Sequence, residues 1–154
     1  MRHASVKLVL FASAFVFGSQ ALAEPVAPDA VQFDDGKVMV SLTGAAGNAE
    51  AGAKTFSDRK LGNCLACHAN SEMSNQLFHG DVGPPLDGVA SRYEEAEIRA
   101  IVTNSKAVFG DDTVMPGFYS LKVGKDVRED LVGKTILTAE QVEDIVAYLT
   151  TLKE

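Results

Sequence analysis

The chain lacks the residues needed for a structural zinc site and has few of the residues that bind polyanions. Its 154 residues include only two cysteines and three histidines, and no tryptophan. A structural zinc site needs four ligands at finger-like spacing, which this set does not supply. The 14 Lys and Arg residues stand against 21 Asp and Glu, for a formal net charge of −7. This balance argues against nucleic acid or an anionic membrane surface as a partner, whereas it permits a basic partner surface.

The chain also lacks a convincing membrane span at its N-terminus. The apolar run Leu8–Gly18 is too short to cross a bilayer. It follows a stretch that carries Arg2 and Lys7 without an acidic residue, and it precedes an A-x-A site at Ala21–Ala23. This three-part pattern is typical of a secretory signal peptide. We expect cleavage after Ala23 and export to the periplasm, and loss of the two basic residues takes the formal charge to −9.

The two cysteines stand in the segment Cys64-Leu65-Ala66-Cys67-His68, which is the C-x-x-C-H arrangement that attaches a c-type haem. Each cysteine can form a thioether to one haem vinyl group, and His68 can be the proximal iron ligand. A C-x-x-C redox pair would want a βαβ context and does not need the adjacent histidine. We therefore predict one covalently attached haem c. Because this haem uses both cysteines, no thiol remains for catalysis on this chain.

Two later segments supply further candidates for contact with the haem. The turn at Pro84 offers a backbone carbonyl to the second ring nitrogen of His68, and Leu86 is expected to pack on the haem face. Met115 lies 47 residues after His68, far enough to cross to the other haem face. Its thioether sulfur is a soft ligand suited to haem iron. We predict His68 and Met115 as the axial ligands.

Two irregular segments leave alternatives open. Ala69–Val82 contains Met73 and His79, which are weaker candidates for the sixth ligand because they lie close in sequence to His68. Ser120–Ile136 carries several basic residues mixed with acids, and this pattern fits either a solvated face or a docking patch. The basic residues are Lys122, Lys125, Arg128 and Lys134.

Apolar spacing and capping residues predict an all-α domain with three main helices. These helices are expected over Asn48–Leu61, Ser91–Ser105 and Thr138–Leu152. Gly52 and Phe56 lie four residues apart on one helical face, where a glycine lets another helix approach closely. The last helix should cross this face and close the fold.

An N-terminal extension, residues 24–48, precedes this domain. Its segment Lys37–Leu42 could form a short strand or part of a β-hairpin, or could lie across a surface. The extension is either a loosely packed leader or a strap that packs on a partner subunit. The expected division is a signal peptide over 1–23, the extension over 24–48 and a c-type cytochrome domain over 49–154.

Taken together, these motifs resemble a class I cytochrome c, and more narrowly the SoxX family. SoxX is the monohaem subunit of the SoxAX cytochrome complex of sulfur-oxidising bacteria. The similar segments are Gly62–His68, Asp81–Gly88, Ile98–Val102, Met115–Tyr119 and Gly133–Leu149, and the extra N-terminal segment is similar as well.

The resemblance implies a c-type cytochrome partner, SoxA, which holds the catalytic haem and its cysteine ligand. It implies that the complex joins thiosulfate oxidatively to a cysteine of a SoxYZ carrier protein. This chain would accept electrons from its partner and pass them to a small cytochrome c, and it would not be catalytic alone. The alternative is a free periplasmic electron carrier, which would not need residues 24–48. A third class, a haem sensor, needs an open sixth position, against which Met115 argues.

Overall fold

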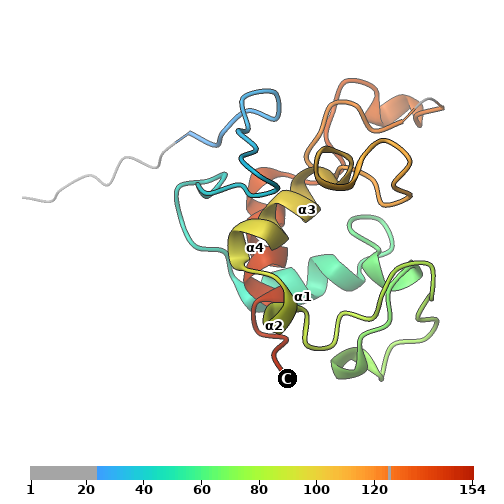
Figure 1. Cartoon of the computed structure of the whole chain (residues 1–154). Helices are drawn as coiled ribbons and strands as arrows, with labels where there is room; N and C mark the ends of the chain where they lie inside the picture. The colour runs from blue at the N-terminus through green and yellow to red at the C-terminus, as the bar shows by residue number, and fades with distance from the viewer. Residues whose placement is uncertain (1–23, 125) are drawn as a thin grey trace, which may run out of the picture.

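The computed structural model describes residues 24–124 and 126–154, which form a helical domain without a strand (Figure 1). The predicted signal peptide, residues 1–23, and Lys125 lie outside the described residues. The elements in chain order are α1 (Ala49–Ser57), the 3-10 turns η1 (Cys64–Ala66) and η2 (Ser71–Met73), α2 (Val89–Arg92), α3 (Glu95–Phe109), the 3-10 turn η3 (Glu129–Leu131) and α4 (Ala139–Leu149). In the described part of the chain, no helix is long and apolar enough to cross a membrane. The predicted all-α class is confirmed.

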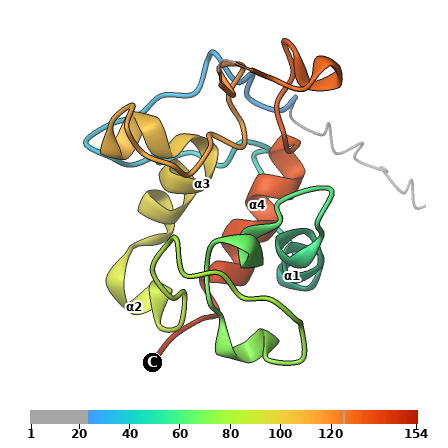
Figure 2. The same cartoon turned by 90° about the vertical axis from the view of Figure 1, so that its right-hand side faces the viewer.

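Helices α1 and α4 cross with their backbones in close contact (Figures 1 and 2). A Cβ atom placed on Gly52 would lie 1.9 Å from the backbone oxygen of Asp144, so no larger residue fits at this position. One turn later, Phe56 is buried and packs edge-on against Tyr148, with ring centroids 5.5 Å apart. The predicted crossing of these two helices is therefore present.

The ends of these two helices follow local hydrogen-bonding rules. At the start of α4, Thr138 and Gln141 form the predicted capping box, in which each side chain accepts a hydrogen bond from the other residue's backbone amide. Helix α1 ends at Ser57, earlier than the predicted Leu61. The reason lies at Asp58, which adopts an extended backbone and whose carbonyl and carboxylate accept bonds from the following turn.

The predicted single helix over Ser91–Ser105 is divided in two and extends further than expected. Tyr93 has an extended backbone between α2 and α3, and Glu94 then begins α3 with a capping box to Glu97. Helix α3 continues to Phe109, but its helical geometry is interrupted at Asn104, where φ is −156° and ψ is 91°. Next to this interruption, the carbonyls of Val102 and Thr103 bond to the loop that follows the helix.

Of the two possibilities for Lys37–Leu42, a short strand and a segment that lies across a surface, the strand is not formed. The described residues contain one isolated β-bridge here, between Asp34 and Lys37. The backbone amide of Val38 instead donates to the carbonyl of Ala96 at 3.0 Å, on α3. Because the amides of Val38 and Leu42 and the carbonyl of Val38 bond to residues of α3 and α4, these groups are not available to pair with another strand.

Residues 24–48 are an integral part of the fold and are not a loose leader. The side chains of Val38 and Leu42 are only 3% and 1% exposed. The hydroxyl of Tyr119 donates to the carbonyl of Val26 at 2.7 Å and so fixes the start of the segment. In Figure 2 the segment, drawn in blue to cyan, passes across one end of the molecule. We call residues 24–48 the N-terminal strap from here on.

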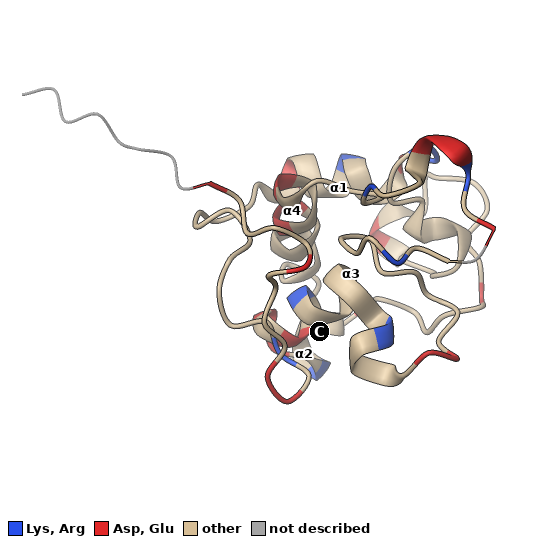
Figure 3. Ribbon diagram, turned by 90° about the horizontal axis from the view of Figure 1, so that it is seen from above, with Lys and Arg blue, Asp and Glu red and all other residues tan. Residues whose placement is uncertain are grey.

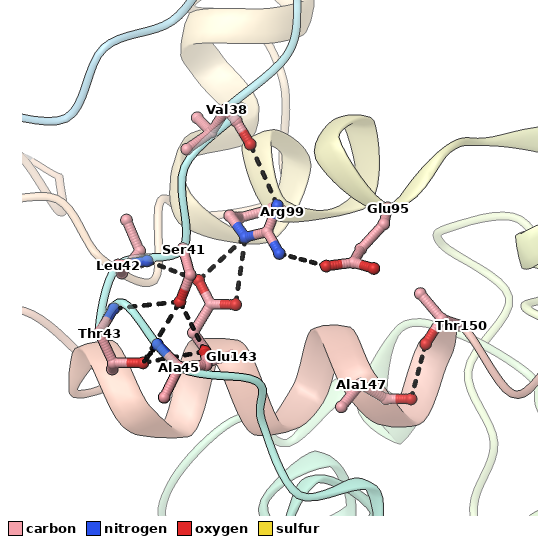
Figure 4. A network of polar contacts seen from close by, with 10 residues as sticks. All are labelled: Val38, Ser41, Leu42, Thr43, Ala45, Glu95, Arg99, Glu143, Ala147 and Thr150. Carbon is pink, nitrogen blue, oxygen red and sulfur yellow. Dashed lines mark hydrogen bonds and ion pairs between the residues drawn. The ribbon is translucent and has the colours of Figure 1, made fainter.

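A buried ion pair joins the strap to two helices (Figure 4). Arg99 of α3 donates through Nε to Glu143 of α4 at 2.9 Å, and both side chains are almost fully buried. The guanidinium also donates to the carbonyl of Val38 at 3.1 Å, and the Glu143 carboxylate accepts the amide of Leu42 at 2.8 Å. A further ion pair joins Arg99 to the more exposed Glu95. The pair therefore satisfies backbone groups of the strap that would otherwise lack partners.

We predict that Arg99→Leu lowers the free energy of unfolding of the haem-loaded protein by about 3–5 kcal/mol, because it leaves the Glu143 carboxylate buried without its cation. Urea denaturation followed by far-ultraviolet circular dichroism measures the loss. The matched control is Lys54→Met, which breaks the exposed pair with Glu50 and should change stability by no more than about 0.5 kcal/mol. Equal effects of the two variants would show that the buried pair has no special role.

Candidate haem site

A large cavity of about 750 Å³ lies between the helices. Its walls come from α1, α2, α3, α4, the η1 turn and neighbouring loops, chiefly those around residues 59–63, 82–86 and 113–118. The lining is mainly apolar and includes Phe56, Ile98, Val102, Ile145 and Leu149. A pocket of this size and character suits a large, flat and mostly apolar ligand.

All six residues predicted to contact the haem line this cavity. They are Cys64, Cys67, His68, Pro84, Leu86 and Met115. The fold therefore brings together side chains from segments that lie as far as 51 residues apart in the sequence.

The cysteines and the histidine are positioned by a tight turn. Asn63 adopts left-handed backbone angles (φ 48°, ψ 36°), which turn the chain into η1. The carbonyl of Cys64 then accepts the amides of Cys67 at 3.1 Å and of His68 at 2.9 Å. Leu65, between the cysteines, points into the core and is buried. This turn keeps both cysteines and His68 at one edge of the cavity.

The surroundings of the Cys64 thiol suit a thioether better than a thiolate. Burial, with a smaller contribution from Cys67, raises the pKa of Cys64 to about 12. Such a site penalises the charged form of the sulfur, whereas a neutral thioether carries no such penalty. The chemistry of the donor set therefore fits covalent attachment of a haem.

His68 is oriented by the predicted hydrogen bond to the turn at Pro84. Its Nδ1 donates to the Pro84 carbonyl oxygen at 2.7 Å, which leaves Nε2 free to bind a metal. Gly83 permits this arrangement, because a Cβ atom placed there would lie 2.3 Å from Cε1 of the imidazole. A bond of this kind fixes the ring and increases its basicity as a ligand.

Two residues that the sequence did not single out hold the Pro84 turn in place. Arg92 of α2 donates to the carbonyl of Pro85 at 2.8 Å and to the carbonyl of Asp87 at 2.6 Å. Ser71 donates through its hydroxyl and its amide to the carboxylate of Asp87, and these bonds lower the pKa of that carboxyl. The carbonyl that orients His68 thus belongs to a turn that is braced from both sides.

Met115 enters the cavity from the loop that follows α3. The loop is fixed to α3, because the buried hydroxyl of Ser105 donates to the carbonyl of Met115 at 2.6 Å. Phe118, three residues later, is buried and also lines the cavity. No signal in the sequence marked Ser105, because its role depends on how the loop folds back over α3.

The structure gives Met73 and His79 a different place from the cavity wall. Neither of them lines the cavity in the described part of the chain. Nδ1 of His79 accepts the amide of Asn70 at 3.3 Å, so Nε2 carries the proton and donates to the carbonyl of Met73 at 3.1 Å. These contacts brace the loop between η1 and the Pro84 turn, and they give no support to either residue as an iron ligand.

The charge of the cavity lining is opposite to that of the whole chain. Asp and Glu are spread around the molecule (Figure 3), yet among the described residues that line the cavity there is no Asp or Glu. Four cations line it instead, namely Arg59, Lys60, Arg92 and Arg128. A haem carries two propionate groups, so a cationic lining complements its charge.

A helical domain with a C-x-x-C-H turn at a large apolar cavity defines a class I cytochrome c. The family model for cytochrome c matches residues 49–153, and the chain belongs to this family and carries one haem c. Among solved structures, the chain is similar to SoxXA from P. pantotrophus, with 42% sequence identity and a TM-score of 0.77. This match covers 84% of the present chain and 99% of the other, and it supports the predicted assignment to SoxX. The comparison with curated proteins gave no match.

We predict that Gly83→Ala displaces the imidazole of His68 and lowers the free energy of unfolding by about 2 kcal/mol, because the added methyl group occupies the space of the ring. The absorbance spectrum of the haem-loaded variant reports the change in ligation, and urea denaturation reports the change in stability. The matched control is Gly124→Ala, since a Cβ atom at Gly124 has no neighbour within 4 Å among the described residues. A wild-type spectrum and stability for Gly83→Ala would contradict the close packing described above.

Proposed function

We propose that this cytochrome c is the electron-transfer subunit of a SoxAX-like heterodimer, which oxidatively conjugates thiosulfate to a cysteine of a carrier protein. The observation that carries the proposal is the 42% identity to a chain of SoxXA over almost the whole length of that chain. The catalytic cysteine and haem belong to the SoxA-like partner in this proposal. The electrons are passed on to a small cytochrome c, and the carrier protein is SoxYZ-like.

On this chain, we assign the thioether bonds to Cys64 and Cys67 and the axial positions to His68 and Met115. The support is that all four line one cavity. The Cys64 carbonyl accepts the amides of Cys67 and His68, the His68 ring is bonded to the Pro84 carbonyl, and the Met115 carbonyl accepts the Ser105 hydroxyl. A bound haem c supplies a one-electron couple, and ligation by His and Met raises its reduction potential. With both axial positions filled by the protein, no open site remains for a substrate, which fits transfer of electrons and not catalysis by this chain alone.

The alternative of a free periplasmic carrier rests on the same haem site and differs in its partner. The strap was the sequence feature expected to separate the two functions. The strap bonds to helices and to the Tyr119 loop of the same chain, and so its burial supports neither function over the other. We also propose a signal peptide over residues 1–23 and a periplasmic location, and both rest on the pattern of the N-terminal sequence.

We predict that Met115→Ala removes the weak sulfur-to-iron band at the red end of the oxidised spectrum and lowers the midpoint potential, because the soft sulfur ligand is lost. Absorbance spectroscopy and redox titration of the haem-loaded protein measure the two effects. Met73→Ala is the matched control and should keep the band, since Met73 does not line the cavity. Persistence of the band in Met115→Ala would exclude Met115 as the ligand.

We predict that the native chain elutes from a size-exclusion column together with a second polypeptide that also retains covalent haem after denaturation. Haem staining of a denaturing gel identifies that polypeptide, and reduction of the purified pair by thiosulfate in the presence of a carrier protein then tests the chemistry. Elution at the mass of a single mature chain, even at high protein concentration, would favour the free carrier.

A further inference from the structure

The interruption in α3 lies at the place where the helix meets the Met115 loop. Asn104 departs from helical geometry, with φ −156° and ψ 91°. Such a residue disturbs the regular hydrogen bonds of the surrounding turn, which frees backbone carbonyls for other partners. The carbonyls of Val102 and Thr103 accept the amides of Phe118 at 3.3 Å and Tyr119 at 2.9 Å. The loop is thus attached to the helix through the helix's own backbone.

Side chains beside the interruption hold the other half of the same loop. The hydroxyl of Ser105, a residue with 0% exposure, donates to the carbonyl of Met115 at 2.6 Å. Lys106 donates through Nζ to the carbonyl of Asp111 at 3.0 Å and also to that of Thr113. Five consecutive residues of α3, 102–106, therefore include four that bind backbone atoms of the loop between residues 111 and 119.

Close packing leaves little room for the loop to shift. A Cβ atom at Gly117 would lie 2.7 Å from Oδ1 of Asn104 and 3.0 Å from the Cβ atom of Ser120. Gly117 is two residues from Met115, so the loop and the interrupted turn fit against each other next to the sulfur. Among these contacts, the bond from Ser105 is the one that ends on the backbone of Met115 itself.

We propose that Ser105 is a positioning residue that keeps the Met115 sulfur bound when the haem is oxidised. This inference deepens the proposed function and rests on Met115 being the sixth ligand. Because ligation by Met raises the reduction potential, the sulfur binds reduced iron more tightly than oxidised iron. The oxidised state is therefore the one in which Met115 depends most on support from the protein. Without the hydroxyl, the Met115 carbonyl is left without its buried donor and the loop opens more readily.

The experiment measures how fast imidazole replaces Met115 in the oxidised, haem-loaded protein, by stopped-flow absorbance. Opening of the loop limits this reaction, so the rate reports how firmly the sulfur is held. Ser105→Ala should raise the rate about tenfold, the effect expected of one lost hydrogen bond to a buried acceptor. It should also lower the midpoint potential. Gly117→Ala, which crowds the same junction through Asn104, should raise the rate as well and serves if Ser105→Ala fails to mature.

Thr103→Val is the matched control. Thr103 lies two residues from Ser105 on the same helix, and its buried hydroxyl has no hydrogen-bond partner among the described residues. Its removal should leave the rate within about twofold of wild type. The proposal is overturned if Ser105→Ala matures and leaves the rate unchanged, whatever the result for Gly117→Ala, or if Thr103→Val raises the rate as much as Ser105→Ala. If Ser105→Ala does not mature, an unchanged rate in Gly117→Ala overturns it. A failure of the ligand assignment is distinguishable, because the sulfur-to-iron band would then persist in Met115→Ala.

Discussion

The backbone contact between α1 and α4 is the constraint on which the rest of the structure depends. Helix packing usually leaves 8–10 Å between axes, and glycine at the contact allows the approach to be closer. With Gly52 against the Asp144 carbonyl, Phe56 on α1 and Ile145 and Leu149 on α4 are brought to a common surface. That surface is one wall of the haem cavity. The close backbone contact between α1 and α4 therefore supports one wall of the haem cavity.

The strap adds a second constraint by fixing α3 against this pair of helices. Arg99 and Glu143 form a buried ion pair, an arrangement that often gives little net stability because two charges lose their hydration. Here the same groups also satisfy backbone atoms of Val38 and Leu42, which lowers the cost of burying the strap. Helix α3 is thereby held at its first half by the strap, while its second half carries the Met115 loop.

The sequence was most informative where the structure depends on local chemistry. The haem-attachment turn, the capping box at Thr138 and the glycine at position 52 each follow from a short pattern, and the structure contains them. The sequence left open whether part of the strap forms a strand, because the partners of its backbone, Ala96 and Glu143, lie 58 and 101 residues away from Val38 and Leu42. Hydrogen bonds between residues so far apart produce no periodic pattern of apolar residues in the sequence. The interruption of α3 was missed for the same reason, since apolar spacing continues on both sides of it.

The distribution of charge limits what the net charge can say about a redox partner. The formal charge of −7 is a sum over the whole chain, and it permits a basic partner surface without requiring one. Screening at physiological ionic strength is effective beyond about 8 Å, so a docked partner responds mainly to groups near the contact. Around the haem cavity those groups are cationic, although Arg128 is paired with Asp130 and Arg92 with backbone carbonyls. Arg92 keeps its positive charge because its partners are neutral carbonyls, whereas the haem propionates would offset part of the cationic lining. The sign of the whole chain is therefore a poor guide to the surface that its redox partner presents.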